Sequence, residues 1–167
     1  MSVWMLRRFE PGDEAHLPDI YGAAVTALGA RDYSAAQVDA WTSLTPSPAG
    51  YRERMEDGRC CIVAVDPASP DRPVAYADIE PNGHIDHLYC APAAAGQGLA
   101  GRLLAALEIQ AKAWGLASIF AEASETALSA FRSRGFEVLQ RRELAVERVP
   151  IHNHAVEKTL SAGLARF

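Results

Sequence analysis

The sequence predicts a mixed α/β (α+β) fold, in which a mostly antiparallel sheet carries helices on both faces. Three observations support this prediction. The segment from His84 to Gly115 has the pattern of a strand, a glycine-rich turn and a long helix. Strand-like runs before it are joined by turn sequences, among them Asn82-Gly83, which is typical of antiparallel hairpins. The strand expected after the long helix is reached by a helical crossover, so it should run parallel to the strand before the turn.

Length and composition predict one domain that spans residues 1–167. Apolar residues make up 49% of the chain, which is enough for a packed core. No apolar run reaches the ~20 residues that a helix needs to cross a bilayer. The apolar part of the N-terminus is too short for a signal peptide. We therefore expect a cytoplasmic protein without a membrane partner.

Net charge and cysteine content limit the classes of partner and metal site that the protein could have. A net charge of −5 argues against nucleic acid, which needs a basic face on the protein. The same acidic field would favour a cationic substrate. The three cysteines are an odd number, which fits reduced thiols, and none has metal-ligand spacing.

The N-terminal half should hold a strand, three helices and two further strands. Asp13 is a candidate cap for the first helix. Ser34 and Gln37 have capping-box spacing, and the helix that they open should bury Val38 and Trp41. The expected elements are strand 3–9, helix 17–28, helix 35–42, helix 49–57, strand 60–65, a connection at 67–73 and strand 74–79.

The C-terminal half should hold two helices and four strands. Strands are expected at 84–91, 118–123, 136–147 and 152–160, the last two joined around Val149-Pro150, and a short helix at 125–134. The resulting order is β-α-α-(α)-β-β-β-α-β-α-β-β. Apolar residues at three- and four-residue steps predict the buried face of the long helix. They are Leu99, Leu103, Leu107, Ala111 and Trp114.

The glycine turn between strand and helix is a candidate phosphate site. Gly96, Gly98 and Gly101 allow a tight turn and a close approach to a ligand. A helix that begins inside such a turn directs unpaired N–H groups at one point, which suits phosphate, and Arg102 lies one turn further on. A tight connection without a ligand is the alternative. The three glycines have the spacing of a dinucleotide fingerprint, but the antiparallel strands expected before the turn do not fit the βαβ unit that such a fingerprint needs. The missing G-K-[ST] ending excludes a P-loop.

The segment Ala95 to Ala100, A-G-Q-G-L-A, resembles the acyl-CoA loop of the GNAT superfamily of N-acetyltransferases, whose pattern is [QR]-x-x-G-x-[GA]. The last three positions fit, whereas Ala95 replaces the usual Gln or Arg. The lead-in L-Y-C-A-P matches the usual L-x-V-x-P. The runs 31–41 and 152–154 are similar to small bacterial members of the YafP-like kind. The resemblance extends from Leu6 to Leu160.

This resemblance implies a GNAT-type sheet whose one parallel strand pair, 84–91 and 118–123, is splayed around acetyl-CoA as co-substrate. Backbone groups of Leu88 to Cys90 would bond the pantetheine amides. Cys90 itself is not expected to be a nucleophile, and Ser124 stands where Asn is frequent. The implied coenzyme contacts are Leu88, Tyr89, Cys90, Ala95, Gly96, Gln97, Gly98, Leu99, Ala100, Gly101, Arg102, Ser124 and Phe131.

Acetyl transfer to an amine requires a base. An amine that titrates near 10.4 costs about 4.6 kcal/mol to deprotonate at pH 7. The resemblance places the base in the strand before the turn. We expect His84 to act with help from Asp86, because histidine titrates near neutrality. Glu122 on the neighbouring strand could bind the amine or serve as a second base. A solvated His84 at a strand end is the alternative.

Regular strand alternation separates the polar groups near the expected base. It splits His84-x-Asp86-His87 across two faces, so no metal is expected. One face should carry His84, Asp86 and Leu88, and the other Ile85, His87 and Tyr89.

Phe131 departs from the family pattern. Many GNAT enzymes have a tyrosine four residues before the Gly-Phe of the last helix, where it protonates the leaving thiolate. Phenylalanine has no proton to donate, so Tyr89, Tyr33 or solvent must protonate the thiolate. The first helical pair would arch over the acceptor, which makes Tyr33, Gln37 and Trp41 candidates for acceptor recognition; Trp41 as a core residue is the alternative.

Three functions fit these patterns. The first is an acetyl-CoA-dependent N-acetyltransferase for a primary amine of a small molecule, or for a protein or peptide amine. The second is a noncatalytic acyl-CoA-binding module, suggested by Phe131 and Ala95. The third is a nucleotide-binding domain, which fits the turn but not the antiparallel strands. The sequence sets neither the acceptor nor the oligomeric state, for which a homodimer is one option.

Overall fold

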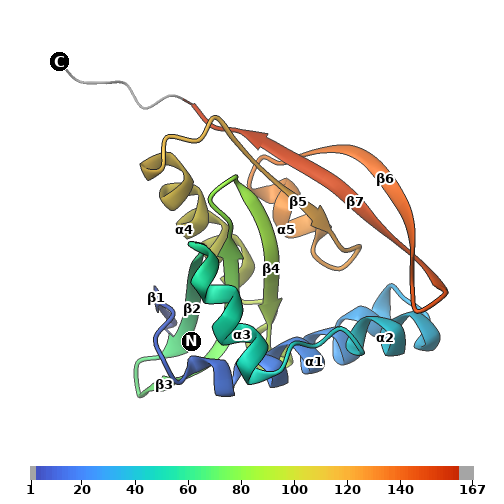
Figure 1. The fold of residues 1–167 in the computed structure, drawn as a ribbon, viewed down its shortest axis with the longest axis horizontal. Helices are drawn as coiled ribbons and strands as arrows, with labels where there is room; N and C mark the ends of the chain where they lie inside the picture. Colours follow the sequence, from blue (N-terminus) through green and yellow to red (C-terminus); the bar gives the residue numbers. More distant parts are fainter. Residues whose placement is uncertain (1–2, 162–167) are drawn as a thin grey trace.

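A computed structural model describes residues 3–161 as one seven-stranded sheet in the order β1-β2-β3-β4-β5-β7-β6 (Figure 1). Neighbouring strands are antiparallel except β4 and β5, which are parallel, as predicted. The strands are β1 (Met5–Arg8), β2 (Cys60–Asp66), β3 (Ser69–Ile79), β4 (His84–Cys90), β5 (Ser118–Ala123), β6 (Glu137–Val146) and β7 (Val149–Thr159).

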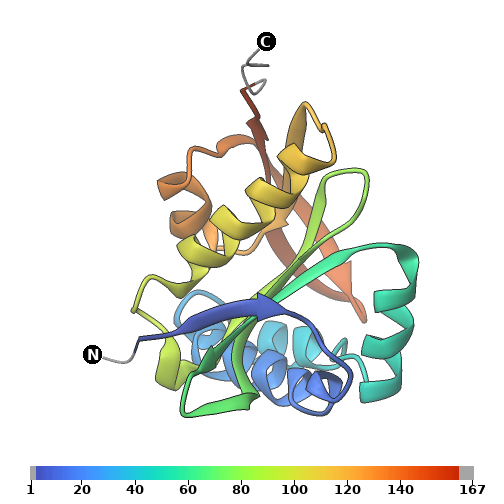
Figure 2. The same ribbon diagram turned by 90° about the vertical axis from the view of Figure 1, so that its left-hand side faces the viewer.

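Helices cover both faces of the sheet, which confirms the predicted fold class. Leu17 and Tyr51, from α1 and α3, pack with Tyr76 on one face. Leu103 and Leu107 of α4 pack on the other, and Figure 2 shows α4 (yellow) and α3 (teal) on opposite sides. No helix of the described residues is long and apolar enough to cross a membrane. The α-helices are α1 (Leu17–Ala27), α2 (Ala35–Thr42), α3 (Pro48–Arg54), α4 (Leu99–Ala113) and α5 (Leu128–Ser133).

The start of α2 follows the local sequence. Ser34 Oγ accepts from the Gln37 amide, and the Gln37 side chain accepts from the Ser34 amide, which completes the predicted capping box. Val38 is buried as expected, but Trp41 is only half-buried.

Two hairpins differ from their predicted bounds. β3 begins at Ser69, so the strand includes most of the stretch expected to be a connection. The last hairpin turns at Glu147 and Arg148, whose φ angles are 48° and 67°, and Pro150 lies inside β7. The proline is tolerated because β5 pairs with β7 only from His154 onward, so β7 has a single neighbour at Pro150.

Two single residues also differ from their expected roles. Asp13 does not cap α1 but accepts two hydrogen bonds of 2.8 Å from the Arg7 guanidinium. Trp114 is the C-terminal cap residue of α4 and is 36% exposed, because Gly115 turns the chain away at this point. Leu104 joins the buried face of α4 instead.

A bulge in β4 overturns the predicted strand alternation. Ile79 pairs with Ile85 and Ala77 with Leu88, so one residue of β3, Asp78, faces two residues of β4. The Asp78 carboxylate accepts the backbone N–H of His87 at 3.0 Å. Ile85 and Leu88 therefore both face α4, while His87 faces the tyrosines beneath α1.

Candidate active site

The glycine turn presents a row of amide hydrogens without protein acceptors. Gly96 and Gly98 have φ angles of 73° and 76°, which glycine adopts at little cost. The first helical bond of α4 runs from the Arg102 amide to the Gly98 carbonyl at 3.1 Å. Within residues 3–161, the amides from Gly96 to Gly101 donate to no protein group. Such a helix start attracts an anion, above all a phosphate.

A cavity of about 550 Å³ begins at this turn and runs between α1, β4 and α5. Leu28 and Trp41 form one wall, and Ser124 and Ala130 form another. The end of β4, from Leu88 to Cys90, borders the cavity as the family resemblance implies.

Two of the expected phosphate ligands point elsewhere. The Gln97 side chain accepts from Trp4 Nε1 at 2.9 Å and donates to the Ala93 carbonyl at 3.2 Å. Arg102 donates to the Trp4 carbonyl at 3.0 Å. Neither side chain lines the cavity, whereas Ala95 does. Backbone groups therefore dominate this end of the site.

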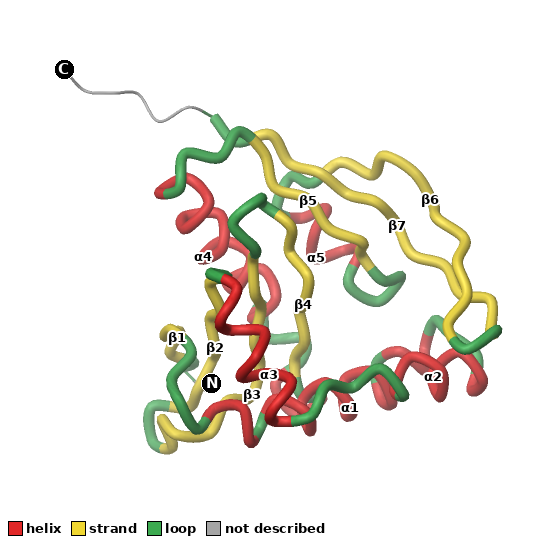
Figure 3. The backbone as a smooth tube through the Cα atoms, viewed as in Figure 1, coloured by secondary structure: helices red, strands yellow, loops and turns green. Residues whose placement is uncertain are grey.

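The parallel strands β4 and β5 separate after the first two residues of β4. They pair only at His84 with Phe120 and at Ile85 with Ala121, and Figure 3 shows them diverging beyond that point. A small cavity of about 50 Å³ lies in this gap, and Phe131 lines it. Phe131 is 3% exposed and packs edge-on against Phe136.

Cys90 and Tyr89 carry protons at neutral pH. Burial raises the pKa of Cys90 to about 11, so the side chain is a thiol rather than a nucleophilic thiolate. Burial also raises the pKa of Tyr89 well above its usual value. Tyr89 packs against Tyr21 with ring centroids 4.5 Å apart and borders both larger cavities of the site.

His84 lies between two carboxylates. Its Nε2 is 2.6 Å from Glu122 Oε2, its Nδ1 is 2.8 Å from Glu80 Oε1, and its ring stacks on Phe120. Burial acts to lower the pKa of His84, but the hydrogen bonds to Glu122 and Glu80 outweigh it and the pKa is raised. Glu122 and Glu80, not Asp86, are the acids that this histidine contacts.

Asp86 belongs to a separate ion-pair cluster. Its carboxylate lies 2.7 Å from Arg54 and 3.3 Å from Arg59, and the same arginines bind the fully buried Asp78. Burial acts to raise the pKa of Asp86, but the surrounding positive charge outweighs it, so the pKa is lowered. His87 on the next position is buried, which lowers its pKa to about 4 and keeps it neutral.

A third cavity, of about 160 Å³, lies on the side where the acceptor is expected. It shares Trp41, Tyr89 and Ser124 with the larger cavity, and Glu122 lies in its wall. Asn153 also lines it, and the Asn153 Oδ1 is buried without a hydrogen-bond partner among the described residues. The remaining lining is mostly apolar: Tyr33, Leu44, Leu144, Val146, Ile151 and His152.

Two of the three residues expected to recognise the acceptor line this cavity, but one does not. Trp41 presents its ring there, with Tyr33 edge-on to it. The Tyr33 hydroxyl accepts from the Glu125 amide at 2.8 Å and donates to the His152 carbonyl at 3.1 Å. Gln37 lines none of the described cavities and instead donates to the Pro150 carbonyl. The residues of β6 and β7 in the cavity were not predicted as site residues, because the run 152–154 indicates only a family likeness and no motif marks Leu144, Val146 or Ile151.

Comparisons with known proteins agree with this geometry. The family model described as an acetyltransferase (GNAT) domain matches residues 29–158. A GCN5-related N-acetyltransferase from Rhodopseudomonas palustris is 31% identical, with 96% of this chain and 98% of that chain covered and a TM-score of 0.85. No curated protein sequence matches the chain.

Two more distant structures share the fold. A GNAT phosphinothricin acetyltransferase from Sinorhizobium meliloti, in complex with acetyl-CoA, is 21% identical over 100% of this chain and 93% of that one, with a TM-score of 0.75. A ribosomal-protein-alanine N-acetyltransferase from Brucella melitensis is 23% identical over 93% and 99%, with a TM-score of 0.71.

Proposed function

The chain belongs to the GNAT acetyltransferase family, and on this premise we propose that it transfers an acetyl group from acetyl-CoA directly to a primary amine of a small molecule. One observation carries the proposal. The unpaired amides of the glycine turn open into a cavity that joins the acceptor-side cavity at Trp41, Tyr89 and Ser124. The proposed diphosphate site and the proposed amine site, which Glu122 lines, thus lie at the two ends of one pair of joined cavities.

The coenzyme end would bind mainly through the backbone. Amides from Gly96 to Gly101 suit the diphosphate, and the edge of β4 from Leu88 to Cys90, which has no strand neighbour on the β5 side, suits the pantetheine amides. The bound thioester supplies the acetyl group. An N–H of that edge aimed at the thioester oxygen would stabilise the developing charge by about 3–4 kcal/mol.

Glu122 and His84 are the pair to which we assign proton uptake. The Glu122 carboxylate lines the acceptor cavity, and His84 lies behind it with Glu80 on its other ring nitrogen. Such a chain can take a proton from the ammonium and move it away from the amine. Asp86 is less suited, because Arg54 and Arg59 lie 2.7 and 3.3 Å from its carboxylate, whereas Arg142 lies 3.5 Å from Glu122.

Tyr89 is the group to which we assign protonation of the leaving thiolate. Phe131 has no proton to give, whereas Tyr89 keeps its phenolic proton and borders both cavities. Tyr33 is less suited because its hydroxyl is engaged by two backbone groups.

The lining of the acceptor cavity favours an amine with an apolar body. Leu44, Leu144, Val146 and Ile151 offer apolar contact, and among the described lining residues there is no lysine or arginine. Arg142, just outside this lining, already pairs with Glu122 Oε1 at 3.5 Å, so an acceptor carboxylate would have no free cationic partner, which is costly. Glu122 offers the negative charge that an ammonium needs.

Two alternatives rest on particular observations. The likeness to the ribosomal-protein-alanine enzyme from Brucella melitensis favours a peptide amine as acceptor. Phe131 and Ala95 favour a noncatalytic acyl-CoA-binding module.

We further propose that the chain belongs among the YafP-like bacterial members, on the basis of the runs 31–41 and 152–154. We also propose a cytoplasmic location, because cysteines 60, 61 and 90 are free.

An amine panel tests the proposal. CoA release from acetyl-CoA would be measured with phenethylamine, phenylalanine, spermidine and a peptide with a free N-terminus. We expect phenethylamine to exceed phenylalanine by at least about tenfold, because of the unpaired carboxylate. Preference for the peptide would favour the second acceptor class. CoA binding without amine-stimulated release would favour the noncatalytic module and refute the proposed reaction.

A further inference from the structure

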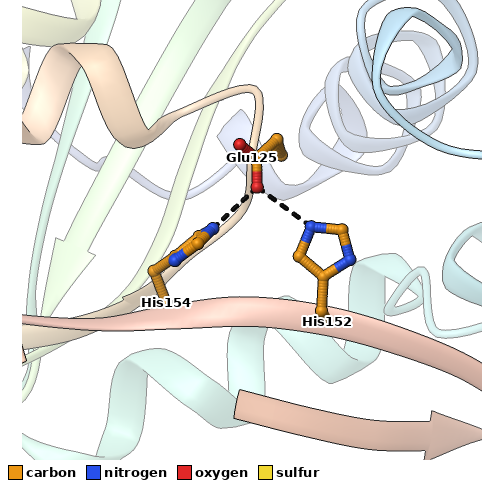
Figure 4. A group of neighbouring side chains, drawn as sticks. All are labelled: Glu125, His152 and His154. Carbon is orange, nitrogen blue, oxygen red and sulfur yellow. Dashed lines mark hydrogen bonds and ion pairs between the residues drawn. The ribbon is translucent and has the colours of Figure 1, made fainter. Parts of the chain in front are cut away.

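Three potential metal ligands meet beside the acceptor-side cavity. Glu125 follows β5, and His152 and His154 come from one face of β7 (Figure 4). Both histidine Nε2 atoms point at the same carboxylate oxygen, at 2.9 Å for His152 and 2.6 Å for His154. The three ligand atoms lie within 4.8 Å of one another. Residues two apart on a strand project to the same side, so the geometry follows from the backbone.

The surrounding structure holds these groups in place. The buried Tyr33 hydroxyl accepts from the Glu125 amide and donates to the His152 carbonyl, so it ties two of the three ligand residues together. His154 lies opposite Ala123 in the β5–β7 ladder, which fixes the third. The histidine side chains are 17% and 13% exposed, and therefore reachable by an ion but largely shielded. Ligands supported in this way lose little freedom when they bind a metal.

The donor set selects a class of ion. Two imidazole nitrogens and one carboxylate suit Zn²⁺ and related first-row divalent ions, whereas Mg²⁺ and Ca²⁺ prefer oxygen ligands. Around a tetrahedral ion with bonds of about 2.1 Å, ligand atoms lie about 3.4 Å apart. The observed separations between the Glu125 oxygen and the two Nε2 atoms, 2.9 and 2.6 Å, are those of hydrogen bonds. To bind the ion, each ring and the carboxylate need to move apart by less than about 1 Å, which small changes of the side-chain torsions can supply.

We propose that Glu125, His152 and His154 form a binding site for one Zn²⁺-class divalent cation. The ion takes the place of the Nε2 protons that now bridge the rings to the carboxylate, and each ring then carries its proton on Nδ1. Three protein ligands leave one position of a tetrahedral ion for water or another ligand. The ion would fasten β7 to the segment after β5 at the rim of the acceptor cavity, since His152 also lines that cavity. The site does not depend on the proposed acetyl transfer.

The test is a Zn²⁺ titration of the metal-free full chain by calorimetry, repeated with Co²⁺ followed by visible absorption. We expect saturation at one ion per chain, and at least a tenfold weaker association in His152→Ala and in Glu125→Gln. His16→Ala is the matched control, because this histidine lies before α1 and outside the cluster, and it should bind as wild type does.

His154→Gln separates metal binding from simple hydrogen bonding. A glutamine amide can still donate to Glu125 but is a poor Zn²⁺ ligand, so the metal-free variant should melt close to wild type and gain no Tm from Zn²⁺. Wild type and His16→Ala should gain. Absence of one-site binding in wild type, or binding that survives in both His152→Ala and His154→Gln, would overturn the site and leave only a hydrogen-bonded cluster.

Discussion

The proposed coenzyme side and the proposed acceptor side of this site are built from different parts of the polypeptide. On the proposed coenzyme side, the amides of one continuous turn, Gly96 to Gly101, have no acceptor among the described residues, while the side chains of Gln97 and Arg102 bind Trp4. Apart from Gln97, the residues of this turn line the cavity. On the acceptor side, Glu122, Trp41 and Asn153 come from separate elements. One region depends on the local backbone conformation, and the other depends on how distant side chains are assembled.

This difference has a chemical consequence. A backbone-built site binds a group that is the same in every reaction of the family, and it tolerates changes of the side chains around it. A side-chain-built site can be altered one residue at a time, which suits the choice of acceptor. Substitutions should therefore act on the two regions separately.

The largest expected effect is on the acceptor side. Glu122→Gln removes the carboxylate that would accept the ammonium proton, and kcat/KM should fall by about 10²–10⁴. The Kd for CoA should be unchanged. Steady-state kinetics and calorimetry measure the two quantities. Asp86→Asn is the control, and a greater loss of kcat/KM there than in Glu122→Gln would return the base to Asp86.

Tyr33→Phe should lower the stability of the fold on the acceptor side. The change leaves the partly buried Glu125 amide and His152 carbonyl without their partner, at a cost of about 1–3 kcal/mol in the free energy of unfolding. Denaturant melts measure this cost. Tyr21→Phe is the matched control, because that hydroxyl makes a long contact of 3.4 Å with the Trp41 carbonyl and ties no two backbone segments together. An equal loss in both variants would contradict the special role of Tyr33.

Gly98→Ala should weaken the coenzyme side alone. A left-handed conformation costs an alanine about 1–2 kcal/mol, which predicts a rise in the Kd for CoA of about 5–30-fold if the turn relaxes to avoid it. Gly22→Ala, inside α1 with open space around it, should leave the Kd unchanged. Arg102→Ala should change the Kd by less than about threefold, since its side chain binds Trp4. A larger loss in Arg102→Ala would mean that side chains, too, hold the diphosphate.

The pH dependence should report the His84–Glu122 pair. Proton uptake needs the neutral imidazole, and the pKa of His84 is raised above its usual 6.5, so kcat/KM should rise with pH through a midpoint above that value. His84→Gln should remove this limb. The same shift stabilises the fold below pH 6.5 and is lost as the pH rises through the raised pKa. A wild-type midpoint below 6.5 would contradict the pairing with Glu122.

Several features of the fold could be predicted because they depend on neighbours in the sequence. The capping box at Ser34, the turn at Gly83 and the helix stripe from Leu99 to Ala111 are each set by residues only a few positions apart. The hairpin at Glu147 could not be predicted from residue type, since neither positive-φ residue there is a glycine. The β4 bulge was hidden for another reason: it requires the Asp78 carboxylate from β3 to accept the His87 amide.

The sequence by itself determined the order of the elements, the parallel strand pair and the glycine turn at the start of α4, because short-range periodicity and glycine conformation govern all three. Only the tertiary structure decided that His84 meets Glu122 rather than Asp86, that Gln37 serves the helix end rather than the acceptor, and that Glu125 meets two histidines of β7. The physical reason is that strand pairing brings together side chains from distant positions, and a one-residue bulge changes which of them share a face.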